Sequence, residues 1–124
     1  MYYVDPAGTG ALTTMGQFGS AYTGSDASAA MFRPGRILQF GGNSNGAAVI
    51  DIRGGAPTFT PTQSMSTQRR LVNGTILADG KVLATGGSRV WNELTDVNNI
   101  AEIWNPDTGG WTQGASGVQA RLYH

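Results

Sequence analysis

The residues best suited to chemistry in this chain are Tyr123 and His124, which stand next to each other. His124 is the only histidine, and there is no cysteine. Imidazole is the commonest metal ligand among side chains, and a phenol beside it would add an oxygen donor. Neither a Ser-His-Asp order nor an H-E-x-x-H motif occurs here, and one terminal histidine cannot supply them. The pair is therefore either half of a metal site or an ordinary strand end.

The other titratable residues suggest no second centre. The acidic residues are scattered, and no two have a spacing that argues for an acid/base pair. Asp79 and Asp107 stand beside glycine or proline and are explained as turn formers. Asn73-Gly74-Thr75 matches an N-glycosylation acceptor, but it lies in a predicted strand and is discounted.

Composition indicates an all-β chain with many tight turns. Of the 124 residues, 40% are hydrophobic and only 13% charged, with 19 glycines and 5 prolines. The net charge is zero, so we expect neither nucleic-acid binding nor membrane-surface binding. No apolar run is long enough to span a membrane. Residues 1–17 lack the basic and apolar regions of a signal peptide, so a secreted parent protein would carry its signal upstream.

An internal repeat organises the chain. "GRILQFGG" (35–42) and "GKVLATGG" (80–87) are the same phrase, 45 residues apart. Each phrase is a short β run bounded by glycine, and its Gly-Gly pair predicts positive φ or close backbone approach. Downstream, Trp104 and Trp111 flank a turn, and Ile52 and Phe59 stand at the same separation in the first copy.

The repeat also extends upstream of each phrase. Arg70-Leu71 precedes the second copy, and Arg121-Leu122 precedes Tyr123 and His124, which places Arg121 at the position of Arg70. In this register Val72 and Asn73 occupy the positions of Tyr123 and His124. Because the repeat accepts Val-Asn there, the Tyr-His pair is not required by the strand. A metal role and an ordinary strand end are then equally favoured.

These features are typical of kelch repeats, which form one propeller blade each. We expect a single all-β, kelch-type β-propeller domain over 1–124, with about two and a half blades of an expected seven. The approximate blades are 1–62 and 63–116, and the next begins at 117–124. A propeller closes with about 4–8 blades, so the chain is expected to be a fragment completed by the remaining blades. A small self-contained β-sandwich is the alternative.

Glycine-bounded apolar runs predict the strands, and no helical period lasts ten residues. "RILQF" and "KVLAT" are continuously apolar and predict inner strands, whereas "IDI" and "AEIW" alternate with acidic residues, which predicts strands exposed on one side. Residues 1–25 are expected to be loop with at most one strand, at 1–4. The other predicted strands are 29–32, 36–40, 47–52, 58–60, 71–77, 81–85, 100–104, 110–113 and 121–124.

The second copy carries a longer loop after its Gly-Gly pair, and Trp91 lies in it. Insertions in repeat proteins map to loops, often on the binding face. An exposed tryptophan there would serve as a sugar platform or the rim of a pocket. The alternative is that Trp91 folds back over the edge of the blade.

The stretch "RLYH" (121–124), at the opening of a kelch strand, resembles the copper-radical oxidases, the family of galactose oxidase, glyoxal oxidase and their bacterial relatives. In that family an R-x-Y-H-S strand opening gives one copper an axial tyrosine and an equatorial histidine, and Arg121, Tyr123 and His124 match it. Other stretches resemble the same family in the same order: "MYYVDPAGTG" (1–10), "GRILQFGG" (35–42), "LADGKVLATGG" (77–87) and "AEIWNP" (101–106).

The resemblance implies a two-electron oxidation of a primary alcohol or aldehyde by O2, giving H2O2, in a secreted enzyme. Tyr123 would be the catalytic base and a copper ligand, His124 a second ligand, and Trp91 a substrate-binding residue. The substrate would be a small alcohol, aldehyde or carbohydrate.

The family also uses a Cys-Tyr cofactor and a second histidine, which these residues do not supply. We therefore expect the isolated chain to be inactive and to bind copper weakly at most. The alternative is a non-catalytic kelch propeller that binds carbohydrate or protein.

Overall fold

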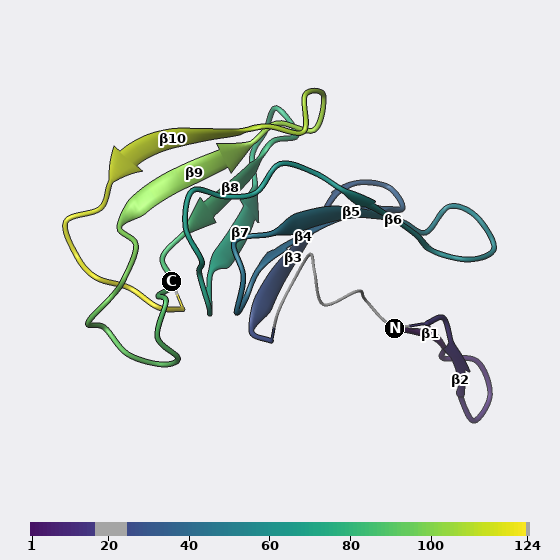
Figure 1. Ribbon diagram of the computed structural model, residues 1–124. Coiled ribbons are helices and arrows are strands. Elements are labelled where there is room, and N and C mark those ends of the chain that lie inside the picture. Colours follow the sequence, from purple (N-terminus) through teal and green to yellow (C-terminus); the bar gives the residue numbers. More distant parts are fainter. Residues whose placement is uncertain (17–24, 124) are drawn as a thin grey trace.

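The computed structural model describes residues 1–16 and 25–123, and these form two antiparallel four-stranded sheets and one hairpin (Figure 1). The hairpin is β1 (Tyr2–Asp5) and β2 (Ala11–Thr14). The first sheet contains β3 (Ala27–Arg33), β4 (Arg36–Gly41), β5 (Ala47–Asp51) and β6 (Thr58–Pro61). The second contains β7 (Asn73–Ile76), β8 (Val82–Thr85), β9 (Ile100–Trp104) and β10 (Trp111–Ser116).

In each sheet the strands pair in chain order, so each is a simple meander. β3 and β7 lie side by side and bring the two sheets into contact. The described ranges contain strands, turns and loops, and no helix in them could cross a bilayer. The predicted all-β architecture of repeated sheets is therefore confirmed.

The "RILQF" and "KVLAT" phrases form β4 and β8, which are flanked by strands on both edges as predicted. Both phrases end on glycines with positive φ, between 65° and 80°. A Cβ on Gly41 would lie 2.8 Å from the carbonyl oxygen of Arg69, and one on Gly87 would lie 2.6 Å from that of Arg70. The Gly-Gly pairs thus satisfy both predictions, a left-handed backbone and close approach of another chain segment.

One hydrophobic core joins the sheets. Trp104 meets Phe32 edge to face at a centroid distance of 4.9 Å, and Trp111 meets Phe40 at 5.5 Å. The tryptophans of the second sheet therefore pack on phenylalanines of the first. Their indole nitrogens donate to the segment that links the sheets, to Thr62 Oγ1 at 3.1 Å and to the Gln63 carbonyl at 2.8 Å. The packing of one sheet on the other thus also fixes the linker.

Strand pairing corrects one position of the sequence repeat. Trp111 pairs with Trp104, and Phe59 pairs with Ile50. The counterpart of Trp104 is therefore Ile50, and the assignment to Ile52 was wrong by two residues. The reason is that β5 and β6 pair for one position more, Asp51 with Thr58, before their turn begins, whereas β9 and β10 end their pairing at Trp104 and Trp111.

Three further predictions were wrong. The hairpin of β1 and β2 adds a strand where loop was expected. The described part of the predicted strand at 121–124, up to Tyr123, has no strand conformation. Glu102 in "AEIW" does not face solvent, because only 1% of it is exposed. The physical reason for the last is an ion pair described below.

Candidate functional site around Tyr123

Tyr123 is held at both ends by asparagine side chains and remains half exposed. Its phenol oxygen donates to Asn92 Oδ1 at 2.6 Å. Its carbonyl oxygen accepts from Asn73 Nδ2 at 2.5 Å. Half of the tyrosine is accessible, with a relative exposure of 50%. His124, the other predicted ligand, lies outside the described residues. Tyr123 is therefore partly open to solvent, and its place is set by two parts of the second sheet's chain, β7 and the connection between β8 and β9.

Backbone hydrogen bonds establish which residue of the repeat Tyr123 replaces. Gly42 N donates to the Arg69 carbonyl at 2.7 Å, and Gly87 N donates to the Arg121 carbonyl at 3.0 Å. Arg121 therefore corresponds to Arg69, and the sequence register that paired it with Arg70 was wrong by one residue. Tyr123 then takes the place of Leu71.

The corrected register sharpens the contrast between the copies. Leu71 and Val72 now stand where Tyr123 and His124 stand, so the earlier copy has two aliphatic residues there. Val72 is 5% exposed and its side chain lies beside Gly41, which makes it part of the core. A tyrosine at the position of Leu71 is thus not needed to build the sheet.

Trp91 lies in the connection between β8 and β9, and it does not fold back over the blade edge. Its relative exposure is 57%. The base of the connection is fixed by bridges from Ser88 to Arg70 and to Val97. Asn92, the residue that accepts from the Tyr123 phenol, directly follows Trp91. The hydrogen bond between Tyr123 and Asn92 therefore places the loop that carries Trp91, the predicted substrate-binding residue, beside Tyr123, the predicted catalytic residue.

A buried ion pair, which sequence reasoning missed, supports this region. Arg69 and Glu102 are 0% and 1% exposed, and Arg69 Nη2 lies 2.7 Å from Glu102 Oε2. Burial lowers the pKa of Arg69, and the hydrogen bond with Glu102 acts in the opposite direction. Arg69 also donates to the carbonyls of Gly86, Asn98 and Ile100. The pair therefore ties the linker to both ends of the Trp91 connection.

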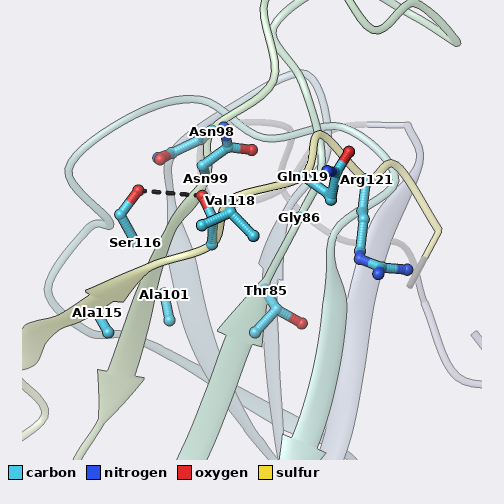
Figure 2. Close-up of a pocket in the computed structure, with 11 residues that line it drawn as sticks. Thr85, Gly86, Asn98, Asn99, Ala101, Ala115, Ser116, Val118, Gln119 and Arg121 are labelled. Carbon is cyan, nitrogen blue, oxygen red and sulfur yellow. Dashed lines mark hydrogen bonds between the residues drawn. The ribbon is translucent and has the colours of Figure 1, made fainter.

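A hollow at the end of the second sheet is not a centre for acid/base chemistry. It has a volume of about 510 Å³ and opens between the ends of β8, β9 and β10 and the segment that follows them (Figure 2). Figure 2 shows small and apolar side chains there, including Ala101, Ala115 and Val118, with Arg121 as the one charged residue. Such a lining suits packing against another protein segment.

Within residues 1–16 and 25–123, no three His, Cys, Asp or Glu side chains cluster in a way that could hold a metal ion. Tyr123 supplies one oxygen donor of a type that Cu(II) accepts. One phenol does not make a copper site, so the described residues fit one position of a ligand set and no redox step follows from them alone.

Comparison with known proteins identifies the fold. No family model matches the chain, and no curated protein matches it. Among solved structures, it is similar to a fungal alcohol oxidase described as having catalytic diversity among the AA5 family and solved in complex with copper. That similarity has a TM-score of 0.87 at 22% identity and covers 97% of this chain and 28% of the oxidase.

A second similarity is to YjhT, with a TM-score of 0.66 at 17% identity, covering 78% of this chain and 29% of YjhT. The chain thus spans less than a third of either protein. At these identities the similarities show the fold. The two meander sheets are blades of a β-propeller, and the predicted resemblance in fold to a copper alcohol oxidase is confirmed over nearly the whole chain.

Proposed function

We propose that this chain is part of the propeller of a copper-radical oxidase related to galactose oxidase and glyoxal oxidase. The observation that carries the proposal is the similarity to a copper-bound fungal alcohol oxidase over 97% of the chain. The complete enzyme would oxidise a primary alcohol, an aldehyde or a carbohydrate with O2 and release H2O2. The same resemblance supports a kelch-type ring of seven blades and an extracellular location.

Tyr123 and His124 would hold the copper together with residues of other blades. Copper and the Cys-Tyr cofactor of the longer protein would together supply the capacity for the two-electron oxidation, one electron each, with O2 as the final acceptor. The accessible phenol of Tyr123 would accept the proton of the substrate hydroxyl. Trp91 would offer an apolar face to the substrate carbon chain or sugar ring. These roles follow the family pattern at the matching residues of this sequence.

The isolated chain is proposed to be inactive. Its 124 residues contain no cysteine and no second histidine, so neither the Cys-Tyr cofactor nor the full ligand set can form within them. We expect weak Cu(II) binding at most. A calorimetric titration that gave tight, stoichiometric Cu(II) binding by this chain would contradict that expectation.

The decisive experiment starts from the longer protein. Its reading frame should encode a cysteine and tyrosine before these residues and a second histidine after them. The expressed protein, loaded with Cu(II), should release H2O2 from a primary alcohol. Tyr123→Phe should lower kcat by about 10²–10⁴-fold, because it removes the proton acceptor. The matched control is Tyr2→Phe, at a tyrosine that is 62% exposed in the separate hairpin. A reading frame without the cysteine or the second histidine would overturn the oxidase proposal.

A non-catalytic propeller that binds carbohydrate or protein is the second candidate. The observation that favours it is the pair of accessible aromatics, Trp91 at 57% and Tyr123 at 50% exposure, on linked segments. Such rings can stack on sugars without a metal. Calorimetry with oligosaccharides would then give binding that survives a chelator and is lost in Trp91→Ala.

A further inference from the structure

Two asparagines, Asn73 and Asn92, hold Tyr123 from opposite ends, and we call them the asparagine clamp. We propose that Asn92 is a positioning residue that fixes the phenol of Tyr123, while Asn73 fixes its backbone. The inference rests on the proposed function for the role of Tyr123, and it adds a residue that the sequence motifs do not single out. Its basis is the 2.6 Å hydrogen bond at the phenol and the 2.5 Å hydrogen bond at the carbonyl.

The backbone of Asn92 has a conformation that suits a fixed position. It has a φ of 55°, in the left-handed region that only a few residue types adopt readily, asparagine among them. The connection that carries it is closed at its base by the Ser88 bridges, and higher up the Arg89 amide donates to the Asp96 carbonyl at 3.2 Å. Asn92 therefore projects from an anchored loop.

The first blade has no counterpart of the contact between Asn92 and the phenol, because it lacks both the long connection and the tyrosine. Its connection between β4 and β5 covers only 42–46, whereas the connection between β8 and β9 covers 86–99. The residue corresponding to Tyr123 is Leu71, which has no hydroxyl to bind. A long connection and a phenol thus occur together at the second blade. This coincidence is what a positioning role predicts.

An amide is well suited to hold the phenol. The Asn92 carboxamide accepts from the phenol hydroxyl through Oδ1, and because it is neutral it adds no charge beside Tyr123. The clamp therefore fixes geometry in the way that substrate-positioning residues do.

The test compares variants of the complete 124-residue chain without metal. Asn92→Gly removes the amide and permits the positive φ, so it avoids backbone strain. Asn92→Asp keeps an acceptor of the same shape. Asn99→Ala changes an exposed asparagine of the same connection and serves as the matched control. Ultraviolet resonance Raman spectra, taken as differences from Tyr123→Phe, report the hydrogen bonding of this one phenol.

We expect the difference spectrum of the wild type to show a strongly donating phenol. Asn92→Asp and Asn99→Ala should retain it, and Asn92→Gly should shift it to the spectrum of a phenol in water. An Asn92→Gly spectrum equal to that of the wild type would overturn the clamp, and so would loss of the signal in Asn92→Asp.

The same variants in the copper-loaded longer protein separate the two proposals. With a positioning role, Asn92→Gly should lower kcat about ten- to a hundredfold with a smaller change in KM, and Asn99→Ala should not. A longer protein without oxidase activity but with the Raman signal intact would overturn the proposed function and leave the hydrogen bond. An active enzyme that is indifferent to Asn92→Gly would overturn the positioning role.

Discussion

Arg69 and Glu102 show how far the value of an ion pair depends on its surroundings. They approach to 2.7 Å, the same separation as Arg33 and Asp107. The first pair is 0% and 1% exposed, and the second is 48% and 72% exposed. Two charges that have left water must be paired, since an unpaired buried charge is costly, whereas an exposed pair contributes little.

We therefore predict that Glu102→Gln lowers the free energy of unfolding by about 3–5 kcal/mol, because it leaves the Arg69 charge buried without its partner. Urea denaturation of the chain measures the change. The control is Asp107→Asn, which breaks the exposed pair at the same distance and should cost less than about 1 kcal/mol. Equal effects of the two substitutions would contradict the prediction.

Asp51 gives a pH-dependent prediction. Hydrogen bonds from the side chain and backbone of Arg53 lower the pKa of Asp51 from 3.8 to about 2. A folded-state pKa below the unfolded value means that the contribution to stability is present above about pH 4 and is lost as the pH falls through 2. A carboxyl ¹³C NMR titration should show Asp51 titrating near 2, and Arg53→Met should move its pKa back toward 3.8. An unchanged titration in Arg53→Met would assign the shift to another cause.

At this scale the sequence indicated Tyr123, because the other copy has a different residue type there, and Trp91, because it lies in a loop that is longer than that of the other copy. It did not indicate the register, because Arg69 and Arg70 are adjacent and either one aligns with Arg121. Only the hydrogen bonds from Gly42 and Gly87 decide between them. The Asn92 contact was likewise beyond the sequence, since it joins residues 31 positions apart through a loop without a repeat counterpart.

At the scale of the elements, Gly74 in β7 lies close against Phe40 of β4 and Ser28 of β3 in the first sheet. A Cβ on Gly74 would lie 2.8 Å from Phe40 Cζ and 3.2 Å from Ser28 Oγ. Phe40 is fully buried and cannot move aside. Its ring occupies the space that any larger residue in place of Gly74 would need, so this glycine sets the distance between the blades.

We predict that Gly74→Ala destabilises the chain by about 1–3 kcal/mol through overpacking. Thermal unfolding followed by circular dichroism would measure the change. Gly114→Ala in β10 is the matched control, because its Cβ would lie at an ordinary 3.5 Å from the Ala101 carbonyl oxygen. If both substitutions lower the melting temperature equally, the close approach is not what matters at Gly74.

Most strands could be predicted because glycine-bounded apolar runs mark them, and β9 (Ile100–Trp104) was predicted at its observed bounds. A strand was expected at 1–4, where β1 lies, but its partner β2 could not be predicted, because β2 is exposed throughout and so lacks apolar alternation. Glu102 was misplaced for a related reason. Alternation identifies a strand with one polar face, but it does not reveal that an arginine from the linker covers that face.

At the scale of the whole molecule, the chain corresponds to a limited part of its structural neighbours, spanning 28% of the fungal oxidase. The hollow shown in Figure 2 lies on the side of the second sheet where Gly87 binds the segment after β10. On the first sheet, the corresponding Gly42 binds the linker that leads into the second sheet. The hollow therefore occupies the position at which a further blade would pack.

We predict that the isolated chain self-associates or has poor solubility, because open sheet edges and an uncovered apolar hollow invite contacts between molecules. Light scattering coupled to size exclusion, over a range of concentrations, would show a mass above that of the monomer. A monodisperse monomer would count against the view that the chain needs further blades.

The bonds from Gly42 to Arg69 and from Gly87 to Arg121 also have a consequence for biosynthesis. Each of these hydrogen bonds joins a glycine within one meander to an arginine that follows that meander in the sequence and so leaves the ribosome later. A completed blade thus displays a free amide on which the next stretch of nascent chain can dock. Blades would be added one after another from the N-terminus, and the order of translation would match the order of assembly.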